Sequence, residues 1–233
     1  MRNSLKSIKI TAFVLLVIAL HSCLKDSEEY YPIQIGTVQV IDKNSENTSF
    51  LLDSSYMLYP KNPENIAHLK LKQNDRVFIQ FSDLSQDESK KELHATIKYI
   101  DLIPTKSIEQ TENENSAMEL IDKSDKINIT DAYITNGFIT FKYTYQGGQK
   151  RPEEHHISMF STTEIDQNSG VLKLYLTHDS QGDFGTNTIS EVITLPVNSI
   201  EEQLTQVKEV KIISKTIIQG VIEHDVYLKN KNK

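Results

Sequence analysis

The sequence predicts an all-β protein in which a small β-barrel is followed by an antiparallel β-sandwich. Three observations support this fold class. Apolar and polar residues alternate in short runs, as at Val77, Ile79 and Phe81, so that one face of each strand covers a core. Clusters of turn-forming residues separate these runs. The alternation stops between residues 105 and 126, which divides the strands into two groups.

The first 22 residues are predicted to be a lipoprotein signal peptide. Basic residues precede an unbroken apolar stretch at 12–20, which is too short to cross a bilayer because a spanning helix needs about 20 residues. Ser22 supplies the small residue that the signal peptidase requires before Cys23. Since Cys23 is the single cysteine of the chain, we expect residues 1–22 to be removed and lipid to be attached to the Cys23 thiol.

The mature chain is acidic. The full sequence has a formal charge of −7, from 25 basic and 32 acidic residues, and removal of Arg2, Lys6 and Lys9 with the signal peptide changes this charge to −10. A surface of this sign argues against nucleic-acid binding, which needs basic residues to neutralise phosphates. A single cysteine also excludes an intrachain disulfide framework and a cysteine-rich metal centre.

Residues 23–32 are predicted to be an acidic tether between the lipid and the first strand. They include the run Leu24-Lys25-Asp26-Ser27-Glu28-Glu29, which resembles the lysine-then-acidic export signal that certain Gram-negative anaerobes use to send lipoproteins to the outer face of the outer membrane. We therefore expect a lipid-anchored protein of the outer membrane, exposed at the cell surface. The periplasmic face of that membrane is the alternative.

The first group of strands, within residues 33–104, predicts a small barrel. Five extended segments are expected, at 33–42, 49–52, 55–59, 76–83 and 93–103. Five short strands in fewer than a hundred residues suit a closed or partly open Greek-key barrel. A single helical turn is predicted near residues 63–69, because Pro63 can occupy the first position of a helix.

Residues 105–126 are predicted to be a linker, because this acidic and amide-rich segment cannot bury enough apolar surface to fold alone. A short helix or strand around residues 118–121 is the alternative within it. The second group of strands fills residues 127–233. Asn136-Gly137 is a strong hairpin signal, since both residues tolerate the positive φ of a tight turn. The seven expected strands, which predict a sandwich, are 127–135, 138–146, 155–161, 171–178, 188–195, 207–216 and 221–228.

Several stretches of the chain are similar to the NigD-like lipoproteins. These stretches follow the lipoprotein signal and the acidic tether, and they are Ser49-Phe50-Leu51-Leu52-Asp53, Leu58-Tyr59-Pro60, Asn74-Asp75-Arg76-Val77, Ile129-Thr130-Asp131-Ala132-Tyr133-Ile134, Tyr145-Gln146-Gly147-Gly148, Leu174-Tyr175-Leu176-Thr177-His178 and Gly182-Asp183. The resemblance implies an OB-like amino-terminal barrel and a carboxy-terminal β-sandwich. The prototype takes its name from a bacteriocin gene cluster, so the resemblance also suggests a link to bacteriocin production or immunity.

No catalytic or cofactor-binding motif emerges from the sequence. The densest set of potential metal ligands is Glu153-Glu154-His155-His156, but adjacent residues of a strand point to opposite faces, so a solvated strand entrance is the favoured interpretation. Asp179 and Asp183 offer oxygen ligands for calcium, but a polar hairpin loop is the favoured interpretation. We therefore expect no metal, no cofactor and no catalytic residue.

The predicted function is non-enzymatic binding of a protein, peptide or glycan ligand. Tyr143, Tyr145 and Tyr175 have the spacing of a sugar-stacking platform, but alternating tyrosines belong more often to a sandwich core, with the hydroxyl at its rim. The expected contact surface is the pair of loops at 147–154 and 179–187, because loops on a rigid sheet can vary without disturbing the core. The alternatives are a structural accessory of the cell envelope and a glycan-binding surface lipoprotein.

Overall fold

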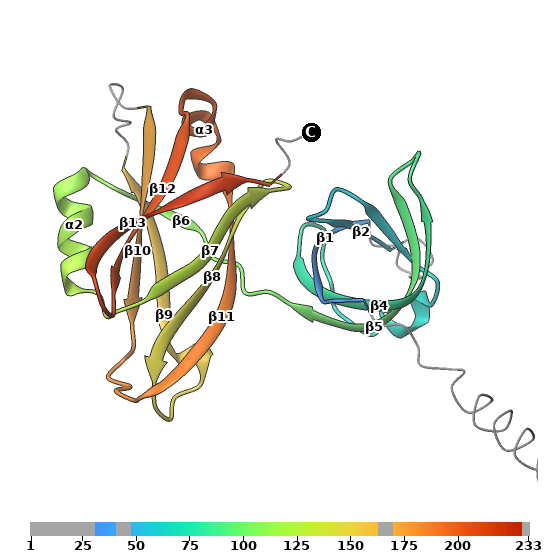
Figure 1. Ribbon diagram of the computed structural model, residues 1–233, viewed down its shortest axis with the longest axis horizontal. Helices are drawn as coiled ribbons and strands as arrows, with labels where there is room; N and C mark the ends of the chain where they lie inside the picture. Colours follow the sequence, from blue (N-terminus) through green and yellow to red (C-terminus); the bar gives the residue numbers. More distant parts are fainter. Residues whose placement is uncertain (1–30, 41–47, 163–169, 230–233) are drawn as a thin grey trace, which may run out of the picture.

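The computed structural model describes residues 31–40, 48–162 and 170–229, which form two β units side by side (Figure 1). The predicted signal peptide at 1–22, the lipid-attachment residue Cys23 and most of the predicted tether lie outside these residues. A search of the described residues for a helix with the length and apolarity of a membrane span finds none.

The first unit is a closed five-stranded barrel. Its strands follow the order β1-β2-β3-β5-β4, and β4 pairs with β1 to close the ring. Val77, Ile79 and Phe81 on β4 are each at most 3% exposed, so the predicted alternation does place one face on the core. The predicted helical turn is the short η1, Pro63–Asn65. The strands are β1 (Gln34–Val40), β2 (Ser49–Leu52), β3 (Met57–Pro60), β4 (Arg76–Asp87) and β5 (Glu92–Leu102).

The second unit is a curled eight-stranded sheet in the order β11-β8-β7-β13-β12-β10-β9-β6. Its inner face encloses one apolar core, in which Phe141 of β8 packs with Leu174 of β10 and Ile212 of β12. The elements are β6 (Ile108–Thr111), α2 (Glu114–Lys123), β7 (Asn128–Thr135), β8 (Phe138–Gly147), η2 (Pro152–Glu154), β9 (His156–Thr162), β10 (Val171–Asp179), β11 (Asn187–Pro196), η3 (Val197–Ile200), α3 (Glu201–Gln206), β12 (Glu209–Thr216) and β13 (Gly220–Leu228).

The all-β prediction of a barrel followed by a sandwich is confirmed, but the sandwich is not purely antiparallel. Strands β10 and β12, β7 and β13, and β6 and β9 pair in parallel. Parallel pairing requires a connection that crosses from one end of the sheet to the other. Between β10 and β12 this crossover is made by β11, η3 and α3, so strands that are distant in sequence become neighbours.

The segment at 105–126 holds β6 and α2 rather than a linker. Asn113 caps α2 by accepting a hydrogen bond from the Ser116 backbone N–H at 2.9 Å. Ala117 and Ile121 are 0% exposed and pack on Tyr175 and Ile213, on the outer face of the sheet. Two small or branched apolar residues one helical turn apart are therefore enough to dock this otherwise polar segment on the second unit.

A buried polar cluster joins the two units. Arg76 at the start of β4 and Asp53 just after β2 form an ion pair within the barrel. The Tyr133 hydroxyl on β7 donates to Asp53 Oδ2 at 2.9 Å, and Arg76 Nη2 donates to Thr140 Oγ1 on β8 at 3.0 Å. These contacts fix the barrel against the β7–β8 hairpin.

The tip of that hairpin also contacts the barrel. Asn136 and Gly137 have φ values of 50° and 79°, as the predicted tight turn requires, and Thr135 pairs with Phe138 across it. The Asn136 side-chain amide donates to the Leu52 carbonyl at 3.3 Å.

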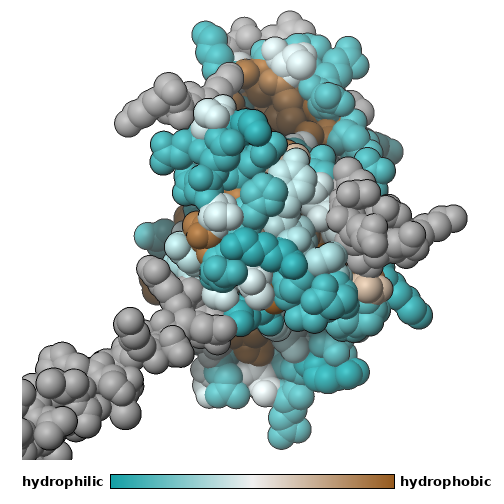
Figure 2. Space-filling view, turned by 90° about the vertical axis from the view of Figure 1, so that its right-hand side faces the viewer, coloured by the Kyte–Doolittle hydropathy of each residue, from teal (hydrophilic) through white to brown (hydrophobic). Residues whose placement is uncertain are grey.

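The barrel-side face of the molecule is largely hydrophilic. Hydrophobic side chains gather on it in a few places, and the largest of these groups lies at its upper end (Figure 2).

Candidate functional site

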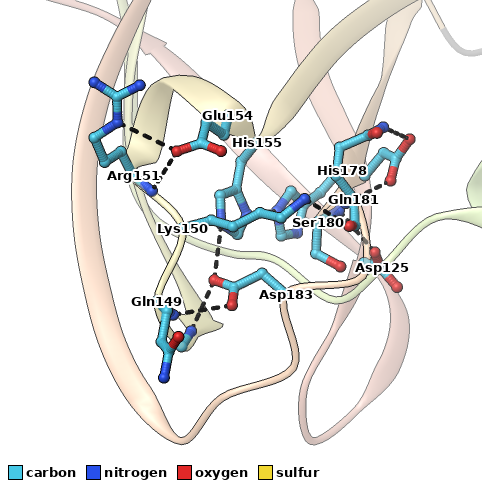
Figure 3. A network of polar contacts seen from close by, with 12 residues as sticks. Asp125, Gln149, Lys150, Arg151, Glu154, His155, His178, Ser180, Gln181 and Asp183 are labelled. Carbon is cyan, nitrogen blue, oxygen red and sulfur yellow. Dashed lines mark hydrogen bonds and ion pairs between the residues drawn. The ribbon is translucent and has the colours of Figure 1, made fainter.

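The two loops predicted as a contact surface lie against each other at one end of the second unit (Figure 3). Asp183, in the loop between β10 and β11, accepts hydrogen bonds from the backbone N–H groups of Gly148 at 2.8 Å and Gln149 at 3.0 Å. Lys150 Nζ donates to the Gln181 carbonyl oxygen at 2.8 Å. The loops at 147–154 and 179–187 therefore form one surface, which we call the paired loops.

Glycine at position 185 allows the close approach of the paired loops. A Cβ atom on Gly185 would overlap the Gly147 carbonyl and the Gly148 Cα. The preceding turn is made by Gln181 and Gly182, which have φ values of 53° and 78°. Gly185 is thus required for the contact between the two loops, and the Gln181-Gly182 turn directs the chain toward it.

A chain of contacts between buried polar groups connects the paired loops to the interior of the second unit. His155 Nε2 lies 3.2 Å from Asp183 Oδ2, and His155 Nδ1 lies 3.0 Å from His178 Nε2. His178 Nδ1 lies 3.3 Å from the Lys126 carbonyl oxygen. The two imidazole rings stack with centroids 5.2 Å apart, and Tyr145 packs against both.

The hydrogen-bond partners of His178 fix the position of its proton. Burial lowers the pKa of His178, so its ring is neutral, and its Nδ1 carries the hydrogen because a carbonyl can only accept. His178 Nε2 therefore accepts from His155 Nδ1. The Gly148 N–H lowers the pKa of Asp183, which keeps this carboxylate ionised beside His155 Nε2. Both ring nitrogens of His155 therefore have a hydrogen-bond partner.

A pocket of about 400 Å³ opens beside this network. Phe184 lies on the pocket wall, and 87% of the residue is exposed to solvent. Burial is the largest influence on Asp125 and opposes its ionisation, but the Ser180 N–H at 2.8 Å and the nearby positive charge of Lys215 act with other contacts to lower the pKa of that carboxyl. The pocket is lined by Ser124, Asp125, Lys126, Gln146, His178, Ser180, Asp183, Phe184, Gly185, Lys215 and Ile217.

The potential metal ligands singled out in the sequence do not converge. His155 is 4% exposed and faces Asp183, whereas the neighbouring His156 is exposed. Asp179 accepts from the Gln181 N–H at 2.8 Å within its own loop, and does not share a site with Asp183. Across the described parts of the chain, no group of three or more histidine, cysteine or acidic side chains is arranged to hold a metal ion.

The tyrosines proposed as a possible platform lie in apolar surroundings. Tyr143, Tyr145 and Tyr175 are 7%, 1% and 1% exposed, so none offers a ring face to a ligand. The exposed aromatic of the site is Phe184, which sequence reasoning missed. Its signal was available, because a large apolar residue stands between Asp183 and Gly185 in the middle of a turn.

Comparisons with known proteins agree with the two-unit architecture. The NigD-like N-terminal OB domain matches residues 35–103, and the NigD-like C-terminal beta sandwich domain matches residues 107–228. No curated protein matches the sequence.

Three solved structures share the fold. A protein of unknown function from Bacteroides vulgatus has a TM-score of 0.64 at 15% identity, over 84% of this chain and 90% of that one. A candidate lipoprotein from Bacteroides fragilis has a TM-score of 0.57 at 12% identity, over 85% and 97%. A NigD-like immunity protein from Bacteroides caccae has a TM-score of 0.54 at 12% identity, over 85% and 92%.

The matched segments correspond to the observed units. The OB match spans the barrel strands from β1 to β5, and the sandwich match begins just before β6 and ends with β13. Because both parts occur in this order and the sandwich domain alone covers more than half of the residues, the chain belongs to the NigD-like family.

Proposed function

We propose that the protein is a lipid-anchored, non-enzymatic binding protein of the outer membrane, exposed at the cell surface, with the paired loops as its contact surface. One observation carries this proposal. Asp183 and Gly185 fix the paired loops to each other, and the residue between them, Phe184, remains 87% exposed at a pocket. Aromatic side chains, phenylalanine among them, are enriched at recognition interfaces, and this one stands between two fixed residues.

The hydrogen bonding of the two histidines supports a binding role over catalysis. A hydrolase or transferase needs a base with a free nitrogen or oxygen beside a nucleophile. Both ring nitrogens of His155 and both of His178 already have partners, at 3.0 to 3.3 Å. The network therefore serves to hold the paired loops in place.

The proposed location depends on the amino-terminal signal. Ser22-Cys23 follows a basic and then apolar segment, and Cys23 is the single cysteine of the chain. Multiple acyl chains on one cysteine would hold the protein stably, since each buried methylene contributes about 0.8 kcal/mol. One relative of the same fold is itself named as a candidate lipoprotein.

Partner capture from intact cells tests the binding proposal. Phe184→Ala should abolish capture of the partner by the tagged, membrane-bound protein, because the exposed ring is lost. Ile33→Ala is the matched control, since Ile33 is 56% exposed but belongs to the barrel end of the chain. Equal capture by both variants would place the contact surface elsewhere.

A second candidate function is immunity to a peptide toxin. It is favoured by the relative from Bacteroides caccae, which is named as an immunity protein. In this case, expression of the protein in toxin-sensitive cells should protect them, and Phe184→Ala should remove that protection. A structural accessory of the envelope would instead tolerate Phe184→Ala in every assay of binding or protection.

A further inference from the structure

We propose that the pocket beside Phe184 binds a neutral saccharide. The inference rests on the proposed binding function and specifies its ligand class. It draws on three properties of the pocket, namely an aromatic ring carried on a fixed backbone, a balanced set of charges and a mixture of hydrogen-bond donors and acceptors.

The backbone that carries the aromatic ring is fixed in position. Phe184 stands between Asp183, which accepts backbone hydrogen bonds at 2.8 and 3.0 Å, and Gly185, which packs on Gly147. The backbone on both sides of the ring is thus fixed before a ligand arrives. The negative face of an aromatic ring attracts the weakly positive C–H groups on one face of a sugar ring, and a backbone that is already ordered loses little entropy on binding.

The charges that line the pocket balance. Lys126 and Lys215 contribute two positive charges, and Asp125 and Asp183 contribute two negative charges. Three of these four groups are already engaged. Lys215 Nζ donates to the Asp122 carbonyl at 2.7 Å, Asp125 accepts from the Ser180 N–H at 2.8 Å, and Asp183 accepts from the paired loops. The lining of the pocket has no net charge that would compensate a strongly charged ligand, so the pocket favours a neutral ligand.

The remaining polar groups of the pocket can form hydrogen bonds with a ligand that is rich in hydroxyl groups. Gln146 is exposed at the pocket and offers both an N–H donor and a carbonyl acceptor, while Lys126 offers donors and Asp125 offers acceptors. A sugar hydroxyl donates and accepts at once, so adjacent hydroxyls can satisfy such a mixed lining. A volume of about 400 Å³ lies in the usual range of small-ligand sites and suits a short saccharide or the end of a longer glycan.

The test is binding of neutral oligosaccharides to the detergent-solubilised full-length lipoprotein. An array of neutral glucose, mannose, galactose and N-acetylglucosamine oligomers identifies a binding glycan, and calorimetry measures its affinity. Phe184→Ala should weaken binding by about tenfold or more, while Phe184→Tyr, which keeps the ring, should retain it. Gln146→Ala should also weaken binding. Ile218→Ala is the control, because Ile218 is 90% exposed and does not line the pocket.

The controls separate this inference from the proposed function. Oligogalacturonate and a basic peptide serve as charged probes. If no neutral glycan binds, or if binding does not depend on Phe184, the saccharide inference is overturned. If partner capture from cells still depends on Phe184 in that case, the proposed binding function is retained. If capture does not depend on Phe184, both the proposed binding function of the paired loops and the saccharide inference are overturned.

Discussion

Arg76 and Asp53 form a two-pronged ion pair in which both side chains are buried. The Nη1–Oδ1 and Nη2–Oδ2 distances are both 2.8 Å, and the side chains are 0% and 3% exposed. The pair belongs to the barrel, but Tyr133 and Thr140 of the second unit each add a hydrogen bond to it. These two hydrogen bonds form only when the barrel and the sandwich are docked.

Replacement of Asp53 by Asn should strongly destabilise the protein. The Arg76 guanidinium would remain buried without a counter-charge, which typically costs about 3–5 kcal/mol. Urea unfolding of the mature protein measures the loss. Tyr133→Phe is the milder comparison, since it removes one hydrogen bond and should cost about 1–2 kcal/mol. A loss for Asp53→Asn no larger than that for Tyr133→Phe would mean that the pair contributes little.

Gly185→Ala should separate the paired loops and abolish partner capture. The added methyl group overlaps the Gly147 backbone, which cannot move as a flexible side chain can. Gly182→Ala is the matched control, because φ at Gly182 is +78° but no atom lies within 4 Å of the added carbon. The control therefore introduces backbone strain without a clash. We expect faster amide exchange at Gly148 and Gln149 in Gly185→Ala alone, and equal exchange in both variants would contradict the close-approach argument.

Acid should destabilise the protein in two steps. Burial lowers the pKa of His178 below its ordinary value of 6.5, so the unfolded chain takes up this proton first as the pH falls. The free energy of unfolding should therefore decrease below about pH 6.5. The Gly148 N–H lowers the pKa of Asp183 below 3.8, so a second decrease should begin near that pH.

Urea unfolding between pH 8 and pH 3 measures both steps. Burial also lowers the pKa of His224, so the first step contains two contributions. His178→Gln should reduce the first step and leave the second, while His224→Gln isolates the other histidine. An unfolding free energy that rises as the pH falls from 7 to 5 would contradict the assigned sign.

Cys23→Ala should release the protein from the membrane fraction. The substitution removes the thiol to which we propose that lipid is attached, and with it the apolar chains that would hold the protein. Cell fractionation followed by immunoblotting gives the distribution. Lys25→Ala, which changes the tether but not the thiol, should remain with the membrane. Retention of Cys23→Ala at the parental level would rule out the lipid anchor.

Strand positions were predictable because they depend on local alternation. Residues 49–52 were predicted as a strand and form β2, and the Asn136-Gly137 turn lies where its positive φ values require it. Helix α2 was predicted only in part, as a short helix or strand around residues 118–121, because its polar composition hides two buried residues, Ala117 and Ile121. Their burial depends on Tyr175, which is far away in the sequence, so local composition carries no sign of it.

The centre of the candidate site depends on the same kind of distant contact. The paired loops were predicted as a surface, but the pairing of His155 with His178 spans 23 residues and joins the residue before β9 to β10. No pattern of sequence spacing predicts that His155 and His178 are neighbours. Parallel neighbours such as β10 and β12 were missed for the same reason, because the sandwich was expected to be antiparallel throughout.

The position of β13 in the sheet sets an order for events during protein synthesis. β13 is the last described strand to leave the ribosome, yet it lies between β7 and β12, in the middle of the sheet. Until it emerges, the β11-β8-β7 and β12-β10-β9-β6 pieces each carry an open edge, which can pair with other chains and aggregate. The five barrel strands are complete long before this point. A chain interrupted before Gly220 would thus carry a full barrel and two unjoined half-sheets.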